Sequence, residues 1–219
     1  MSEKTIKSVH ARQLIDCKCR PLVEVDVITE GGALGRGAAP TGSSGGMYES
    51  YVLRDNDPNE YHGLSVHKAV QNVNEIIAPK LIGMDVSDQR AIDDVMIALD
   101  GTPDKHVLGG NAIYSTSIAC FRAAAANEHR PLYDYIAGGD IKTVSIPSFN
   151  VINGGLNDGI RQAYNEFIVM PYRADDIEHA VEIAVDVFQH LGPVIRRYTG
   201  KEAAVGRSYG WTAPSENPE

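Results

Sequence analysis

Hydrophobic and polar residues alternate along the first forty positions in the way that is typical of β-strands. Residues 22–27 show this alternation most clearly, so one face of that strand is expected to be buried and the other exposed to water. Residues 5–15 and 33–39 are also alternating or β-branched, and Glu30-Gly31-Gly32 is typical of a hairpin turn. The pattern therefore predicts a three-stranded antiparallel meander.

The spacing of the hydrophobic residues then changes to that of helices. Residues 66–78 and 88–99 have this spacing. The motif at residues 108–113, LGGNAI, opens a third helix that runs to about residue 128 and is rich in alanine. The small side chains of Ala119, Ala123 and Ala124 indicate that another element packs closely against this helix.

Two short apolar runs begin the second part of the chain. Residues 146–152 are apolar and β-branched, which favours a buried strand, and Asn153-Gly154-Gly155 is typical of a sharp turn. Residues 167–170 predict a second strand, and Glu166 stands immediately before it.

A long amphipathic helix is predicted over residues 176–198. Gly192-Pro193 is expected to kink or divide it, because proline removes a helical hydrogen bond. Residues 212–219 are expected to form a frayed tail. The apolar stripe of this helix consists of Val181, Ala184, Val185, Phe188 and Leu191.

The polar segment at residues 138–143 predicts a short linker between two domains. We place the first domain at residues 1–139 and the second at residues 144–219. The composition is that of a globular protein, with 43% hydrophobic and 22% charged residues in a chain of 219.

Charge and hydropathy exclude several classes of function. The formal net charge of −9 disfavours binding to nucleic acid or to anionic membranes. No run of apolar residues is long enough to span a bilayer, and the first ten residues lack the apolar core of a signal peptide. A cytoplasmic location is the resulting prediction.

The three cysteines do not predict a disulfide framework. Cys17-x-Cys19 also lacks a second pair of Cys or His residues at the spacing of metal ligands, which disfavours a zinc site. Cys120 lies in an apolar helical run and is interpreted as a core residue.

The residues alone leave the role of Glu166 open, and they favour a plain structural role for the segment at residues 40–49. Glu166 is either a solvated residue at the margin of a strand or an acid held for chemistry. Residues 40–49, PTGSSGGMYE, are small and polar with three glycines, which is typical of a mobile surface loop.

The stretch at residues 145–171 resembles the start of the barrel domain of enolase (phosphopyruvate hydratase). The resemblance extends from about Ile6 to the end of the chain, and residues 40–49 are similar to the catalytic loop of that family. It implies an α+β amino-terminal domain, with a three-stranded antiparallel meander followed by helices, and then an incomplete enolase-type β/α barrel segment. The residues of the stretch that match in order are Pro147, Asn150, Ile152, Asn153, Gly154, Gly155, Glu166, Phe167 and Pro171.

The resemblance also implies a chemistry. Enolases are carbon–oxygen lyases of glycolysis that convert 2-phosphoglycerate into phosphoenolpyruvate and water, with two Mg²⁺ ions stabilising the carbanion. Glu166 matches one of the two glutamates that serve the departing hydroxide, and Ser44 matches a ligand of the second Mg²⁺. Substrate contacts fall on Gly42, on Asn157 in place of a histidine, and on Asn165 in place of a glutamine.

The chain departs from the family where the rest of the chemistry should lie. The motif of the second glutamate is matched by residues 206–214, GRSYGWTAP, which contain no carboxylate and place Arg207 within it. The base lysine and the magnesium carboxylates come from later barrel strands. Residues 145–219 are too few for a closed barrel, which takes about 250 residues.

These departures predict an enolase-family pseudoenzyme, truncated and inactive as an isolated chain. Two alternatives stay open. One is half of a split enolase that a second chain completes, and the other is a non-catalytic interaction module. The partners expected are a small phosphorylated acid if the chain is active, and otherwise a second copy of itself or a complementing enolase chain.

Overall fold

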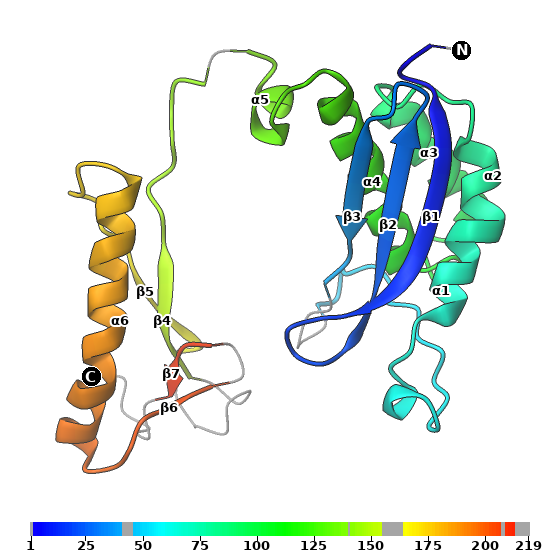
Figure 1. Ribbon diagram of the computed structural model, residues 1–219. Coiled ribbons are helices and arrows are strands. Elements are labelled where there is room, and N and C mark those ends of the chain that lie inside the picture. The colour runs from blue at the N-terminus through cyan, green and yellow to red at the C-terminus, as the bar shows by residue number, and fades with distance from the viewer. Residues whose placement is uncertain (1, 41–45, 140, 155–163, 207–208, 213–219) are drawn as a thin grey trace. The chain divides into compact units, whose positions relative to one another are not determined.

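The computed structural model describes residues 2–40, 46–139, 141–154, 164–206 and 209–212 (Figure 1). The chain divides into two compact units, residues 1–141 and residues 142–219, called unit 1 and unit 2. Each unit is described by itself. No helix among the described residues is both long and apolar enough to cross a membrane.

Unit 1 begins with the predicted meander. Strands β1 (Ile6–Ile15), β2 (Pro21–Thr29) and β3 (Leu34–Ala38) form an antiparallel sheet in the order β1-β2-β3. The central strand has Val23, Val25 and Val27 fully buried on one face, as the period of two requires. The sequence-based expectation of a three-stranded antiparallel sheet is confirmed.

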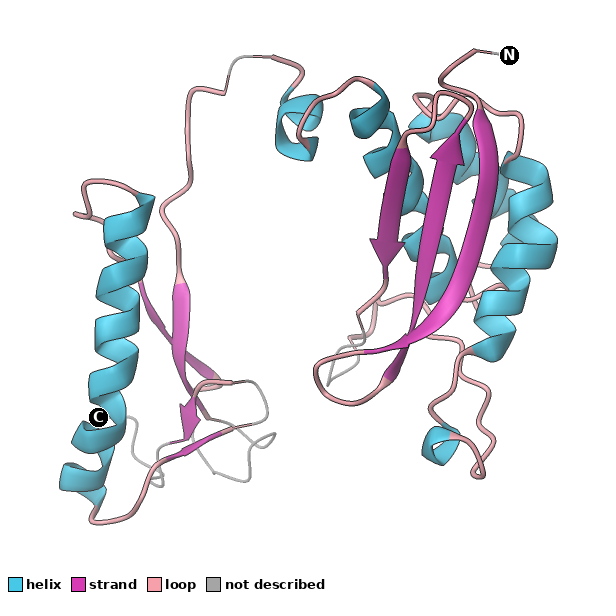
Figure 2. Cartoon of the chain, viewed as in Figure 1, coloured by secondary structure: helices cyan, strands magenta, loops and turns pink. Residues whose placement is uncertain are grey.

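Helices cover the face of the sheet that carries these valines (Figure 2). After the short 3₁₀ helix η1 (Tyr61–Gly63) the chain forms one nearly continuous helical stretch and then three separate helices. The elements are α1 (His67–Gln71), the π-helix η2 (Asn72–Ile77), α2 (Ala78–Leu81), α3 (Gln89–Asp100), α4 (Gly110–Asn127) and α5 (Leu132–Ala137).

The first predicted helix is longer than expected. It was expected to end at residue 78, before Pro79, but the helical backbone continues to Leu81. Pro79 stands near the start of α2 but inside this helical stretch, so it removes one helical hydrogen bond without ending the helix. The preceding π-helical turn marks the change of hydrogen-bond pattern at this point.

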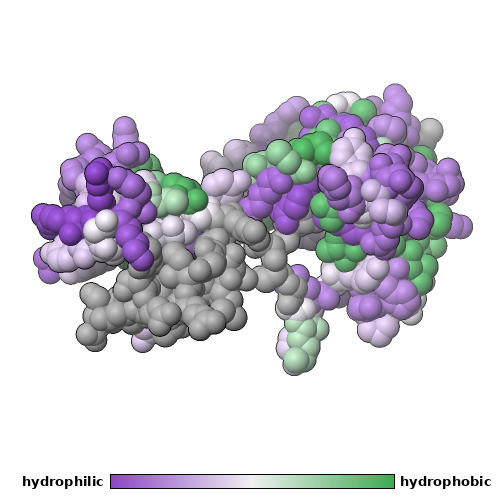
Figure 3. Space-filling model, turned by 90° about the horizontal axis from the view of Figure 1, so that it is seen from below, coloured by the Kyte–Doolittle hydropathy of each residue, from purple (hydrophilic) through white to green (hydrophobic). Residues whose placement is uncertain are grey.

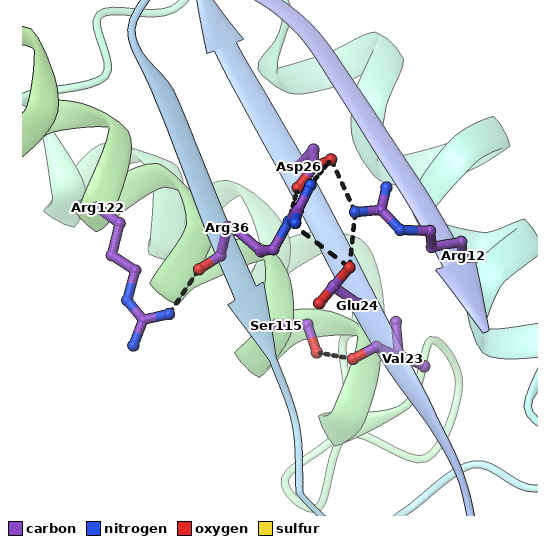
Figure 4. A network of polar contacts seen from close by, with 7 residues as sticks. All are labelled: Arg12, Val23, Glu24, Asp26, Arg36, Ser115 and Arg122. Atoms are coloured by element: carbon purple, nitrogen blue, oxygen red, sulfur yellow. Dashed lines mark hydrogen bonds and ion pairs between the residues drawn. The ribbon is translucent and has the colours of Figure 1, made fainter. Parts of the chain in front are cut away.

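The close packing expected around the alanines of α4 is present, and its partner is β3. A Cβ atom built on Gly37 would lie 2.2 Å from the carbonyl oxygen of Ser115, and one built on Gly35 would lie 2.0 Å from that of Ala119. The Ser115 hydroxyl also donates a hydrogen bond of 3.0 Å to the carbonyl oxygen of Val23 (Figure 4). The sheet and α4 therefore approach each other backbone to backbone.

The opposite face of the sheet carries a network of ion pairs (Figure 4). The Arg12 Nη2 atom lies 2.6 Å from Glu24 Oε1 and 2.8 Å from Asp26 Oδ2, and Arg36 Nε lies 2.7 Å from Asp26 Oδ1. The hydrogen bond from Arg36 has the largest effect in lowering the pKa of Asp26, which falls to about 2. Partial burial opposes this shift, and the hydrogen bond from Arg12 adds to it. The surface that Figure 3 shows on unit 1 is mostly hydrophilic, with smaller hydrophobic patches.

The low pKa of Asp26 predicts a dependence of stability on acid. Because the folded pKa lies below the unfolded value, the carboxylate stabilises the fold above about pH 4, and this contribution is lost as the pH falls through about 2. We expect Asp26→Asn to lower the free energy of unfolding by about 1–2 kcal/mol at pH 7. The difference from the unmodified chain should shrink between pH 4 and pH 2, measured by urea denaturation.

The matched control for this prediction is Asp94→Asn. Asp94 is exposed on α3. Its substitution should leave the dependence of the free energy of unfolding on pH the same as in the unmodified chain. An Asp26→Asn profile parallel to that of the unmodified chain over the whole pH range would contradict the prediction.

Unit 2 is built on a four-stranded sheet of mixed direction. Strands β4 (Phe149–Asn153) and β5 (Glu166–Val169) are antiparallel, β4 and β7 (Trp211–Thr212) are parallel, and β6 (Ala204–Val205) is antiparallel to β7. The order is β5-β4-β7-β6. The predicted frayed tail thus begins with a strand residue, Thr212, and its remainder, residues 213–219, lies outside the described residues.

The first strand of unit 2 is displaced from its predicted position. It begins at Phe149 rather than at residue 146, and Ile146 is 52% exposed. It ends with Asn153, which was expected to start the turn. Asn153 extends the strand because its side chain has a buried partner, described below.

Helix α6 (Ile177–Thr199) is continuous through Pro193, so of the two outcomes expected there, a kink or a division, the division is wrong. The carbonyl group that loses its helical donor belongs to Gln189, which is exposed, so water can satisfy it. The buried residues of the helix are Ala180, Ala184, Gly192 and Ile195. Val181 and Val185, expected in the buried stripe, are 43% and 52% exposed.

Candidate functional site

Glu166 and Asn165 stand where β5 begins and β4 ends. Glu166 is the first residue of β5 and pairs across the sheet with Asn153, the last residue of β4. The N–H of Gly154 donates a hydrogen bond of 3.0 Å to the carbonyl oxygen of Asn165. Both site residues are exposed. The pairing of β4 with β5 thus fixes the backbone position of Glu166, while its side chain faces solvent.

The side chain of Asn153 links this position to β7. Asn153 is only 3% exposed, and its Oδ1 atom accepts a hydrogen bond of 2.7 Å from the N–H of Gly210. A Cβ atom on Gly210 would lie 2.1 Å from the same oxygen, so only glycine fits here. Asn153 and Thr212 are also register partners in the parallel pair β4–β7. Three strands therefore converge on Asn153.

Trp211 attaches β7 to α6. Its Nε1 atom donates a hydrogen bond of 2.7 Å to the carbonyl oxygen of Phe188, and the two rings stack with centroids 5.4 Å apart. The indole also lies over Gly192, where a Cβ atom would come within 2.9 Å of the ring. Strand β7 is thus held against α6 by packing and by a partly buried hydrogen bond.

A cavity of about 510 Å³ lies beside the Trp211 indole, at the carboxyl-terminal end of α6. Glu166 and Asn165 are not among its lining residues. The Arg196 side chain in its wall is 3.0 Å from Glu202 Oε1, so this charge is offset. The lining consists of Gly192, Pro193, Arg196, Arg197, Glu202, Ala203 and Trp211.

Gly42, Ser44 and Asn157, the other site residues predicted from the sequence, lie outside the described residues, as does Arg207. The described ends of the loop that contains Gly42 and Ser44 border a cavity of about 220 Å³ in unit 1. Its lining residues are Ala39, Pro40, Glu49, Ser50, Val52, Gly110, Asn111 and Tyr114.

Asn111 fixes the segment that leaves this loop. It is 5% exposed, and its amide accepts a hydrogen bond from the N–H of Leu53 at 3.1 Å and donates one to the Leu53 carbonyl at 3.2 Å. The N–H of Gly110 donates to the carbonyl oxygen of Tyr51 at 2.7 Å. Sequence reasoning read residues 108–113 only as the start of a helix. The asparagine after two glycines is the signal that could have indicated this second role.

Comparison with protein families agrees with this architecture. Residues 6–136 match the family model described as the N-terminal domain of enolase, and residues 141–218 match that of the C-terminal TIM barrel domain of enolase. The first of these matches alone covers more than half of the chain.

The chain belongs to the enolase family. The sheet-then-helix order of unit 1 is that of the enolase amino-terminal domain, and unit 2 contributes strands of the enolase barrel domain. The resemblance found in residues 145–171 is thereby confirmed at the level of the family.

Enolases generally bind Mg²⁺, so the residues present must be tested against that ion. Mg²⁺ prefers oxygen ligands in octahedral geometry, usually with one or two carboxylates. Among the described residues of this enolase-family chain, no three His, Cys, Asp or Glu side chains are grouped so that they could hold a metal ion. Glu166 stands beside Asn153 and Asn165, whose amides bring no charge. The described part of the chain does not fit a magnesium site.

Proposed function

We propose that this 219-residue enolase-family polypeptide does not convert 2-phosphoglycerate into phosphoenolpyruvate by itself and acts as a non-catalytic member of the family. The observation that carries the proposal is the surroundings of Glu166. Glu166 is exposed, and its register partner on β4 is Asn153, whose side chain is bound by the N–H of Gly210. Acids that act in catalysis are usually held in partly buried, charge-paired positions.

The roles left to these residues are those of binding. The Asn165 amide can donate a hydrogen bond to a phosphate or carboxylate oxygen, whereas the Glu166 carboxylate repels such anions. Proton removal next to a carboxylate requires a base and strong stabilisation of the resulting charge. In enolases these groups come from the second glutamate motif and from later barrel strands. Here the first is replaced by residues 206–214, and the 219 residues contain no match to the others.

A second candidate function rests on the two outer strands of unit 2, β5 and β6, each of which pairs with a single strand among the described residues. Strands β5 and β6 are the outer strands of the four-stranded sheet, whereas a barrel closes its sheet and leaves no edge. Ile168 and Met170, at and just after β5, are 52% and 53% exposed, and Val185 on α6 is 52% exposed. A second polypeptide with the remaining barrel strands could cover these groups and supply the missing base and carboxylates.

A direct assay tests both candidates. Purified chain is mixed with 2-phosphoglycerate and Mg²⁺, and the absorbance of phosphoenolpyruvate is followed. A parallel reaction contains extract of the source organism depleted of its ordinary enolase. We expect no turnover above background in either reaction. Turnover only with extract would favour the split enzyme, and turnover by the purified chain alone would overturn the proposal.

The variant Glu166→Gln sharpens the assay. We expect it to leave the absorbance traces of the purified chain unchanged, because residues 206–214, which match the second glutamate motif, contain no carboxylate. Glu182→Gln, which removes an exposed carboxylate from α6, is the matched control. Loss of turnover with Glu166→Gln but not with Glu182→Gln, in the presence of extract, would show that Glu166 works in a completed site.

A further inference from the structure

The N-terminal half of α6 carries a line of exposed apolar side chains. Ile177, Val181 and Val185 are spaced by four residues, so they follow one another along one side of the helix. They are 54%, 43% and 52% exposed, although the same helix buries Ala180 and Ala184. These three side chains form an apolar surface at the boundary with solvent, which we call the ridge.

The C-terminal half of the same helix borders a hollow. The cavity of about 510 Å³ beside the Trp211 indole is lined in part by the apolar residues Gly192, Pro193 and Ala203. Gly192 follows Val181 by eleven residues, which is close to three turns of an α-helix, so the ridge and the cavity share one side of α6. One copy of the chain therefore carries both a protruding and a hollow apolar surface along one helix.

The charges beside these two surfaces have opposite signs. Glu178 and Glu182 are exposed and stand next to the ridge, whereas Arg196 is exposed and lines the cavity. Their spacings of four and fourteen residues place the three side chains along one line of the helix. A second α6 that runs antiparallel to the first would bring carboxylates opposite guanidinium groups, and a parallel one would bring like charges together.

The ion pair that Arg196 already makes leaves it able to bind a second carboxylate. Arg196 Nη1 lies 3.0 Å from Glu202 Oε1, and the two side chains are 67% and 73% exposed. Exposed pairs of this kind contribute little to stability, and a guanidinium group has five N–H donors. Arg196 can therefore keep its contact with Glu202 and still contact a carboxylate from another chain.

We propose that α6 is the interface of a two-fold symmetric dimer of this chain, in which the two helices pack antiparallel and the ridge of each copy enters the cavity of the other. With the two-fold axis at the level of residue 187, Val181 lies opposite the partner's Pro193 and Glu178 lies opposite the partner's Arg196. Each contact occurs twice, as a self-complementary interface requires. This interface goes beyond the proposed function and does not use the outer strands β5 and β6.

The dimer should be weak and reversible. A helix of 23 residues is about 35 Å long and about 10 Å wide, so a contact along one side of it is smaller than the roughly 800 Å² per partner of a standard interface. The net charge of −9 on each copy adds a repulsion between the two chains. We expect a dissociation constant of about 10–100 μM.

Sedimentation equilibrium of the full chain over a wide range of concentrations tests the proposal. We expect the average mass to rise with concentration from that of one chain towards that of two. Val181→Asp should raise the dissociation constant about tenfold or more, because it buries a charge in the cavity of the partner. Val181 is exposed in the single chain, and an unchanged Trp211 emission would show that unit 2 still folds.

Two results would overturn the proposal. One is the mass of a single chain at every concentration up to several hundred micromolar. The other is a dimer that Val181→Asp does not weaken, which would assign self-association to a different surface, such as the outer strands of unit 2.

Exchange of charges between two variants tests the antiparallel register. Glu178→Arg and Arg196→Glu should each weaken the dimer about fivefold or more, because each places like charges opposite one another. A one-to-one mixture of the two variants forms a mixed dimer in which both pairs again have opposite charges, so its affinity should recover. A mixture that associates no more tightly than the separate variants would contradict the register.

Asp94→Arg is the matched control for these variants. It changes the net charge by the same amount as Glu178→Arg, but Asp94 is exposed on α3 in unit 1. We expect it to leave the dissociation constant within about twofold of that of the unmodified chain. A loss of affinity equal to that of Glu178→Arg would show that net charge, and not the pairing of α6 helices, governs the association.

Discussion

Gly37→Val is expected to lower the free energy of unfolding of unit 1 by about 3 kcal/mol or more. A Cβ atom at this position would lie 2.2 Å from the Ser115 carbonyl oxygen and 2.6 Å from the Ala119 N–H nitrogen. Both are backbone atoms of α4, so a change of rotamer cannot relieve the clash. The strand or the helix must move, and overpacking of this kind costs about 1–3 kcal/mol, or more where backbone is displaced.

Two measurements isolate this effect. Urea denaturation followed by circular dichroism gives the change in free energy, and hydrogen exchange of peptides that cover β2 shows that the loss lies in unit 1. Ala38→Val is the control, because Ala38 is the next residue of β3 and points to the opposite face. A loss below about 1 kcal/mol for Gly37→Val would mean that β3 can move away from α4 freely.

The architecture of unit 1 follows from patterns that short segments carry. The alternation in residues 22–27 predicts a strand with one buried face, because every second side chain of a strand lies on the same face. The small residues of α4 predicted a close neighbour. They could not identify Gly35 and Gly37 as that neighbour, because the contact joins residues about eighty positions apart in the chain.

The site was less predictable because its key contact is not local. Glu166 was placed immediately before a strand and is in fact its first residue. Asn153 was assigned to a turn, since Asn-Gly-Gly is typical of one. A hydrogen bond from Gly210, 57 residues away, keeps Asn153 in β4 instead. The spacing of hydrophobic residues cannot reveal such a long-range contact. Only the family resemblance indicated that residues 206–214 belong to the site.

Gly210→Ala is expected to destabilise unit 2 by about 2–4 kcal/mol, since it forces the buried amide of Asn153 away from its partner. The new methyl group would lie 2.1 Å from Asn153 Oδ1 and 3.1 Å from the Asn153 N–H nitrogen. The chain contains a single tryptophan, Trp211, so its fluorescence reports on unit 2. We expect a red-shifted emission and a lower urea midpoint. Gly200→Asn, at the open left-handed end of α6, should change neither by much.

A double-mutant cycle with Asn153→Ala then shows whether this pair is the cause. Removing the side chain that clashes should make the double variant more stable than the sum of the two single changes predicts, by about 1 kcal/mol or more. Additive losses would place the strain elsewhere, for example on the backbone of β4. A positive coupling would show that the segment matching the second glutamate motif has a structural role in this chain. Its glycine holds β7 against Asn153.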